Sequence, residues 1–315
     1  MARLTYVRAA VVAAALLSAT AAAPAGSAPK RDVDADLPQA DVFLEGIGVD
    51  KRAGVFYVSA TNQSGALYRG DTRKRDQVLE LWQPPRAGDN GRGIDVDRLG
   101  RVYVAGGPAA QVREFSRAGE LLAELPTGAA GSFPNDVWVG PDGAAYVTDS
   151  SLPVIWRVSN GPGGWSIERW VDVSPTIAYT APLTDFDLGG IVSTADGRFL
   201  LAAQGTTGQL WRISLRTRRI AQVDLGGARL TNADGIVLRG RTLWVVQNFT
   251  RQISKLKLRH RYERADLEAV VATPADRTFT TAKRVGGRLL VVDSKFGFPP
   301  AAAVAEDRVV SLHVF

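Results

Sequence analysis

PNDVWVGPDGAAYVTD, from Pro134 to Asp149, is the segment of this chain from which its architecture can be read. Two short runs rich in Val, Trp and Tyr flank the turn-forming residues 140–143, a pattern typical of a tight β-hairpin. Related segments recur, each opening with a charged or small residue before an apolar run. The six repeats open at Glu45, Arg92, Asn135, Gly189, Asp234 and Thr280.

The spacing of the repeats identifies the fold class. Subtraction of successive starting positions gives intervals of 47, 43, 54, 45 and 46 residues. A period of about 40–50 residues with several short strands per repeat is typical of propeller blades. The sequence therefore predicts an all-β protein, a six-bladed β-propeller of four-stranded antiparallel blades. To close the ring, residues 309–314 should join the sheet of residues 289–292, together with a segment before Glu45.

The N-terminal segment reads as a targeting signal rather than as part of the fold. Arg3 and Arg8 precede an apolar run from Ala9 to Ala23, which predicts a secretory signal peptide over residues 1–25. The run is short for a membrane span, and the chain has no cysteine for a lipid anchor or a disulfide. We therefore expect a secreted protein without a membrane anchor, whose residues 26–315 form one propeller domain.

The charge pattern does not suggest a nucleic-acid partner. The formal net charge is +6, and the basic clusters at residues 216–219 and 251–264 alternate with apolar residues. Basic residues on outer blade edges discourage edge-to-edge pairing, so we expect a monomer that binds no nucleic acid. The two histidines, His260 and His313, lie away from the repeat openings. A Ser-His-Asp hydrolase is therefore not expected.

The repeat openings are the candidate functional residues. In a propeller the innermost strand of each blade lines a central channel, so the residues that open these strands meet at one mouth. Glu45, Asn135 and Asp234 would bring oxygen ligands from three blades to this point. Oxygen ligands without sulfur or imidazole suit Ca²⁺, Mg²⁺ or Mn²⁺. Alternatively, these side chains only cap backbone groups in turns.

Three segments also resemble a known family. The Glu-Gly-Ile of residues 45–47, residues 134–149 and the Ala-Asp-Gly-Ile of residues 233–236 are similar to the gluconolactonase and regucalcin (senescence marker protein) family. The resemblance implies a six-bladed propeller with one divalent cation held in the channel by Glu, Asn and Asp, and hydrolysis of lactones or related esters. It implies metal-ligand roles for Glu45 and Asp234, and a substrate or outer-ligand role for Asn135.

One position departs from the family pattern. The family has a metal-binding Asn at the opening of its fourth repeat, where this chain has Gly189. Asp185 and Asp187 lie just upstream and could supply an oxygen instead. The metal site that we predict therefore consists of Glu45, Asn135 and Asp234, with waters completing the coordination of the cation.

The leading functional hypothesis is an exported, metal-assisted hydrolase of a small lactone or ester, with Ca²⁺ as the expected cation. Asp234 or Asp136 would accept a proton from water, and Arg92 would orient the substrate. A propeller that binds a ligand or a protein without catalysis is one alternative. Another is a metal-free acid–base enzyme that uses the same pocket.

The interval between the third and fourth repeats is the longest. Its extra residues fall between Gly161 and Leu188 and include several aromatic residues. Such a segment can form a lid over a site, or it can decorate an outer strand. The sequence leaves both interpretations open.

Overall fold

The computed structural model describes residues 33–39, 42–61, 65–180, 186–296 and 307–313. The predicted signal peptide, residues 1–25, lies outside this part of the chain and stays a prediction. The described residues are almost entirely β-strand, with short 3-10 helices at η1 (Gly107–Ala109) and η2 (His260–Tyr262). None of the described helices is long and apolar enough to cross a membrane.

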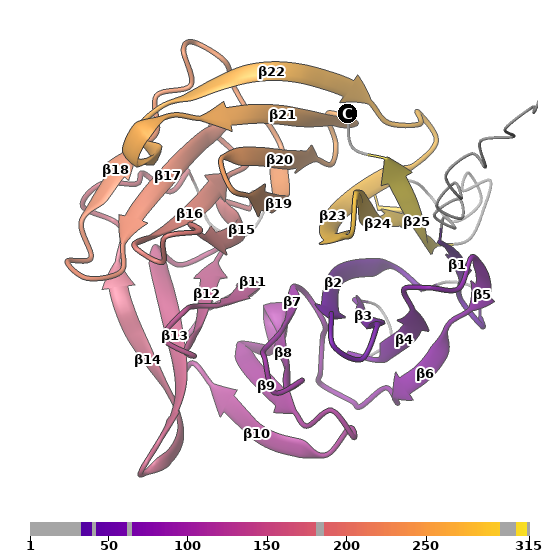
Figure 1. The fold of residues 1–315 in the computed structure, drawn as a ribbon. Coiled ribbons are helices and arrows are strands. Elements are labelled where there is room, and N and C mark those ends of the chain that lie inside the picture. Colours follow the sequence, from indigo (N-terminus) through magenta and orange to yellow (C-terminus); the bar gives the residue numbers. More distant parts are fainter. Residues whose placement is uncertain (1–32, 40–41, 62–64, 181–185, 297–306, 314–315) are drawn as a thin grey trace, which may run out of the picture. The chain divides into compact units, whose positions relative to one another are not determined.

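Six β-sheets surround a central axis, as Figure 1 shows, and this confirms the predicted six-bladed propeller. Blade 1 contains β2 (Leu44–Asp50), β3 (Val55–Ala60), β4 (Leu67–Asp71) and β6 (Glu80–Gln83). Blade 2 contains β7 (Ile94–Val96), β8 (Val102–Ala105), β9 (Gln111–Phe115) and β10 (Leu121–Pro126). Blade 3 contains β11 (Pro134–Val139), β12 (Ala145–Asp149), β13 (Val154–Gly161) and β14 (Gly164–Asp172).

Blades 4 and 5 repeat the same antiparallel order. Blade 4 contains β15 (Leu188–Ser193), β16 (Phe199–Gln204), β17 (Gln209–Ser214) and β18 (Ile220–Gln222). Blade 5 contains β19 (Ala233–Arg239), β20 (Thr242–Gln247), β21 (Gln252–Leu258) and β22 (Ala265–Ala272). In each of these five blades the first strand lies nearest the axis (Figure 1).

Blade 6 joins the two ends of the described chain. Its strands are β23 (Thr278–Val285), β24 (Arg288–Ser294), β25 (Arg308–His313), β1 (Asp34–Asp36) and β5 (Asp76–Val78). β25 pairs with β24, and β1 pairs antiparallel with β25, so the predicted closure is confirmed. The sheet has five strands rather than four. The extra strand is β5, which lies in the chain between β4 and β6 of blade 1 and pairs parallel with β1.

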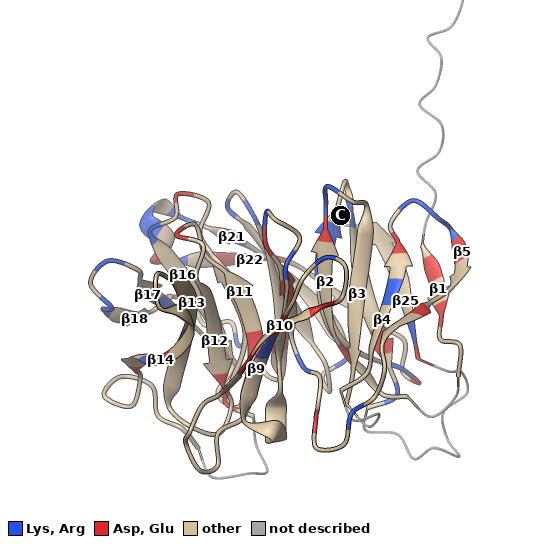
Figure 2. Ribbon diagram, turned by 90° about the horizontal axis from the view of Figure 1, so that it is seen from below, with Lys and Arg blue, Asp and Glu red and all other residues tan. Residues whose placement is uncertain are grey.

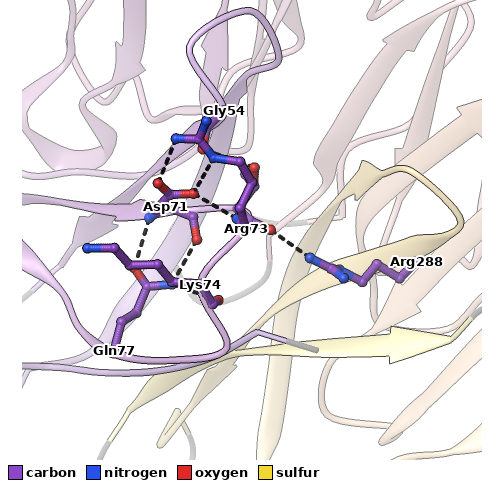
Figure 3. A network of polar contacts seen from close by, with 7 residues as sticks. Gly54, Asp71, Arg73, Lys74, Gln77 and Arg288 are labelled. Atoms are coloured by element: carbon purple, nitrogen blue, oxygen red, sulfur yellow. Dashed lines mark hydrogen bonds and ion pairs between the residues drawn. The ribbon is translucent and has the colours of Figure 1, made fainter. Parts of the chain in front are cut away.

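Side-chain contacts reinforce the closure between blades 6 and 1. Arg288 of β24 is buried and donates to the carbonyl oxygen of Thr72, just after β4, at 2.6 Å. Figure 3 shows the adjacent network, in which Arg73 donates to the Asp71 carboxylate at 2.9 and 2.7 Å. The Arg73 hydrogen bonds lower the pKa of Asp71 to about 2. This corner of blade 1 is thus fixed against blade 6 by polar contacts as well as by strand pairing.

The hydrophobic core lies between the blades. Trp156 and Trp211 are 2% and 5% exposed, as expected for tryptophans that pack between blades. The indole nitrogen of each donates to a side chain seven residues earlier, Asp149 at 3.0 Å and Gln204 at 3.0 Å. Each tryptophan therefore both fills the core and ties the third strand of its blade to the end of the second.

Part of the long interval before Leu188 forms the outer strand of blade 3, and Thr180 and Phe186, near its end, line the pocket described below. Residues 154–172 form the hairpin of β13 and β14, whose eight and nine residues make it longer than its counterparts in blades 2 and 4. The lid interpretation falls partly on residues 181–185, which lie outside the described part of the chain. The outer-strand interpretation accounts for the hairpin.

Basic and acidic residues are interspersed along the strands and loops in Figure 2.

Candidate active site

The six repeat openings meet at one pocket. Glu45, Arg92, Asn135, Gly189, Asp234 and Thr280 all line a cavity of about 380 Å³ at the mouth of the channel. The sequence placed these residues just before the inner strands. In blades 1, 3, 4, 5 and 6 they instead lie inside the strand, within its first three residues. A cavity of this size matches small-molecule sites, which occupy roughly 300–1,000 Å³.

A β-bulge shared by five inner strands directs their opening residues toward the pocket. Five inner strands shift register against their partners at the opening residue. The shifts fall between Leu44 and Ile47, Pro134 and Val137, Leu188 and Ile191, Ala233 and Ile236, and Phe279 and Ala282. Such bulges commonly redirect a side chain next to an active site. They explain why these residues face the pocket.

In several repeats the residue after the opening residue is glycine, and the reason is steric. A Cβ atom on Gly46 would lie 2.1 Å from the carbonyl oxygen of Arg92 in the next blade. One on Gly235 would lie 2.0 Å from Thr281 Oγ1. Because neighbouring inner strands approach this closely, a side chain at either position would clash with the next blade.

Hydrogen bonds between blades fix the opening residues in place. Ser59 Oγ donates to the carbonyl oxygen of Arg92 at 2.6 Å. Thr280 Oγ1 donates to the carbonyl oxygen of Glu45 at 2.7 Å. The backbone at the mouth is therefore held by side chains of the neighbouring blade, which gives the pocket a rigid floor.

Glu45 and Asp234 form the acidic part of this floor. Glu45 is 7% exposed, and its Oε2 atom has no hydrogen-bond partner among the residues that the structure describes. Burial, and then the charge of Asp234, raise the pKa of Glu45 well above its usual value. Burial likewise raises the pKa of Asp234 to about 7, against the hydrogen bond from Asn248. Both carboxyl groups therefore hold protons at unusually high pH, as acid–base catalysts do.

Arg92 supplies the positive charge of the site. Its guanidinium carbon lies 5.0 Å from the ring centroid of Phe133 and 6.0 Å from that of Phe296. Burial lowers the pKa of Arg92, while the charges of Glu45 and Asp234 oppose this effect. Its buried Nε has no hydrogen-bond partner. The guanidinium is thus positioned by aromatic rings and can bind an oxygen of a ligand.

Two amides complete the polar floor. Asn135 Nδ2 donates to Ser150 Oγ at 2.7 Å, so its amide oxygen remains to accept a hydrogen bond or to bind a cation. Asn248 Nδ2 donates to Asp234 Oδ2 at 2.9 Å. Asn248 follows β20 directly and was not anticipated from the sequence. It orients the carboxylate that the sequence predicts to be catalytic.

The donor atoms fit a hard cation only in part. Glu45, Asp234 and Asn135 offer carboxylate and amide oxygens, the ligands that Ca²⁺ and Mg²⁺ prefer, and Glu45 has an unpartnered oxygen. Gly189 contributes no side chain at the fourth position. Within the described ranges, no three His, Cys, Asp or Glu side chains are grouped closely enough to hold a metal ion. Waters would have to supply the remaining ligands.

Asp136 occupies a different position from the other predicted site residues. It does not line the mouth pocket. Its two carboxylate oxygens accept backbone N–H groups of Val137 at 2.9 Å and of Ile191 at 3.1 Å. Burial raises its pKa, and the charge of Lys283, which pairs with Asp95 at 3.5 Å, opposes this. Asp136 therefore links blades 3 and 4, and its catalytic role stays a prediction.

The two aspartates upstream of Gly189 do not fill the missing ligand position in the described structure. Asp185 lies outside the described residues. Asp187 is buried, and it accepts hydrogen bonds from Gln204 at 2.8 Å and from Thr206 at 2.5 Å. These contacts engage its carboxylate within blade 4. His260 and His313 are exposed and do not line the pocket either.

The walls of the pocket come mostly from loops that the sequence analysis did not assign to it; Phe186 is an exception, because it lies in the interval that could form a lid. These residues precede the first strand of a blade or follow its second strand, and include Phe133, Phe186, Asn232, Asn248, Phe249 and Phe296. In an antiparallel blade, the start of the first strand and the end of the second lie at the same end. Hairpin geometry was therefore a usable signal for these positions.

Comparisons with known proteins show the same fold. Regucalcin from Agrobacterium tumefaciens, a calcium-binding protein, aligns with a TM-score of 0.65 at 14% identity, covering 89% of this chain and 95% of that chain. A gluconolactonase from Xanthomonas campestris aligns at 0.58 and 17%, covering 86% of each. Virginiamycin B lyase from Staphylococcus aureus aligns at 0.62 and 13%, covering 90% and 99%.

Sequence comparison adds nothing to this likeness: no protein-family model and no curated protein matches the chain. The solved structures thus bear out the resemblance to regucalcin and gluconolactonase at the level of the propeller fold. One fold hosts many activities, so the function has to be argued from the pocket.

Proposed function

We propose that the protein hydrolyses a small lactone or ester in the mouth pocket. The observation that carries this proposal is the grouping of two carboxyl groups of raised pKa, the buried Glu45 and the partly buried Asp234, with the guanidinium of Arg92 in one cavity of about 380 Å³. A base and a fixed positive charge are the groups that ester hydrolysis requires.

The roles follow from the contacts. Asp234, held by Asn248, accepts a proton from the attacking water. The water oxygen bonds to the carbonyl carbon, and Arg92 stabilises the negative charge that develops on the carbonyl oxygen. The acyl carbon–oxygen bond then breaks, and the proton passes from Asp234 to the leaving oxygen. The products are an alcohol and a carboxylic acid, which are one hydroxy acid when the substrate is a lactone.

A divalent cation, with Ca²⁺ the first choice, completes the proposal. Glu45, Asp234 and the amide oxygen of Asn135 would hold it, with waters at the position where Gly189 has no side chain. When bound, such a cation polarises a carbonyl group and lowers the pKa of water. It would also balance the two carboxylates, for which Arg92 alone supplies positive charge in the floor.

Calorimetric titration with Ca²⁺ tests the cation. The wild type should bind, and Asp234→Asn should bind weakly because one charged ligand is lost. Gly189→Asn should bind more tightly, because it adds an amide oxygen at a position where a Cβ meets no atom closer than 3.5 Å. Asp234→Asn should also reduce lactone hydrolysis by about 10²-fold or more. Unchanged hydrolysis by this variant would contradict the proposed base.

A metal-free acid–base enzyme is the second candidate. It is favoured by the incomplete ligand set at Gly189 and by the presence of Arg92, which places a permanent cation beside the carboxyl groups. Activity that survives a chelator and does not respond to added Ca²⁺ would select this candidate. Activity that is lost with the chelator and restored by Ca²⁺ would select the first.

A further inference from the structure

Four phenylalanine rings form the apolar part of the pocket wall, beside the polar side chains of Thr206, Asn232 and Asn248. Phe133 and Phe186 precede the inner strands of blades 3 and 4, and Phe249 and Phe296 follow the second strands of blades 5 and 6. Phe186 and Phe249 are 47% and 54% exposed. Rings exposed to this extent add little to the core of the fold. Their gathering around one cavity points to an apolar ligand instead.

The polar side chains of the wall are already engaged within the protein. Thr206 donates to Asp187 at 2.5 Å, and Asn248 donates to Asp234 at 2.9 Å. Asn232 Nδ2 donates to Thr250 at 3.0 Å. A polyhydroxylated ligand would lose hydrogen bonds to water on entering this pocket, and these groups have only part of their hydrogen-bonding capacity left to replace them.

The polar floor and the aromatic rings of the pocket adjoin at Arg92. Its guanidinium carbon lies 5.0 Å from the ring centroid of Phe133 and 6.0 Å from that of Phe296, and its pKa responds to the charges of Glu45 and Asp234. Phe133 in turn contacts Phe186, with ring centroids 5.0 Å apart. A ligand that matches this arrangement has one polar group for the floor and an apolar body that lies against the rings.

We infer that the substrates are uncharged lactones or esters that carry an alkyl chain or an aryl group, rather than sugar lactones. This inference rests on the proposed function for the reaction, and on the aromatic wall for the substrate class. The carbonyl oxygen binds at Arg92, and the substituent packs against Phe186 and Phe249. Each methylene buried there adds to transition-state binding.

A homologous series of γ-lactones, from γ-butyrolactone to γ-decalactone, tests the inference alongside glucono-δ-lactone. We expect kcat/KM to rise by up to about fourfold for each added methylene until the wall is covered. Phe249→Ala and Phe186→Ala should each lower kcat/KM for γ-decalactone by about tenfold, with a smaller loss for γ-butyrolactone. Leu99→Ala is the matched control, because Leu99 is 66% exposed and lies outside the pocket.

The outcomes separate the substrate class from the reaction. Faster turnover of glucono-δ-lactone than of γ-decalactone would overturn the inference and leave the hydrolase intact. An equal loss across the series in both Phe variants would also overturn it. If no lactone is hydrolysed, calorimetric binding of γ-decalactone, weakened by Phe249→Ala, supports the apolar pocket while the hydrolase proposal fails. The absence of both turnover and binding of γ-decalactone would overturn the inference.

Discussion

At the scale of single residues, Glu45 and Asp234 are the site residues whose charged forms are most unfavourable in the folded protein. Both carboxyl groups are surrounded by protein, and burial is the largest cause of their raised pKa values. Arg92 lies near enough to influence both pKa values, but it forms no ion pair with either among the described residues. Groups arranged for stability alone would be paired, so this frustration is characteristic of a functional pocket.

The pKa of Asp234 predicts the pH dependence of the activity. A general base acts in its ionised form, so kcat/KM should rise about tenfold per pH unit below the pKa of about 7 and level off above it. A bound divalent cation favours the ionised form and should therefore move this rising limb to lower pH. The measurement is a pH–rate profile with chelator and with added Ca²⁺.

The control for this profile is Asp234→Asn, whose residual activity should lack the rising limb near pH 7. A limb that persists unchanged in Asp234→Asn would assign the base to another group, with Glu45 the first candidate. If the rising limb of the wild-type profile lies at the same pH with and without Ca²⁺, the metal-free enzyme would be favoured.

At the scale of secondary-structure elements, the β-bulge of the inner strand positions the residues of the site. It turns the opening side chain toward the channel, and it brings the following residue against the next blade. Side-chain hydrogen bonds from the neighbouring blade then hold this geometry, as Thr280 does for Glu45. In each bulged strand, one residue therefore faces the pocket and the next one packs against the neighbouring blade.

This geometry predicts a large effect on stability for a glycine substitution in one inner strand and a small effect in another. Gly235→Ala would place a Cβ 2.0 Å from Thr281 Oγ1 and 2.6 Å from its Cα, so it should destabilise the protein by about 1–3 kcal/mol. Gly189→Ala is the control, because its Cβ would meet no atom closer than 3.5 Å, and it should change stability by less than about 1 kcal/mol. Urea unfolding midpoints decide between them, and equal midpoints would show that the blades can separate to accept the methyl group.

The same contrast explains what the sequence could and could not predict. The openings at Glu45, Asn135 and Asp234 recur in phase with the blades, so their convergence on one pocket was predictable from the period alone. The register shift was not, because a bulge depends on how two strands pair. Hairpin geometry could have indicated the loop positions of the aromatic wall, but the residues of these loops vary from blade to blade, so the repeat does not predict which of them carry a phenylalanine.

At the scale of the whole molecule, the ring depends on a closure between distant parts of the chain. β25 lies between β24 and β1, so it pairs with strands from both ends of the described chain. Val309 of β25 and Ala35 of β1 are fully buried partners in this ladder. Such long-range pairing covers the outer edge of β25, which would be exposed in an open ring.

Truncation tests this closure. A chain that lacks residues 308–315 loses β25, exposes the edge of β24 and leaves β1 without its antiparallel partner. Because the blades support one another around the ring, we expect a lower urea midpoint for the whole protein, detected alike by tryptophan fluorescence and far-UV circular dichroism. A chain that ends at His313 keeps the strand and is the control. A full truncation with an unchanged, single unfolding transition would mean that the ring is held by blade packing alone, without the strand that joins its ends.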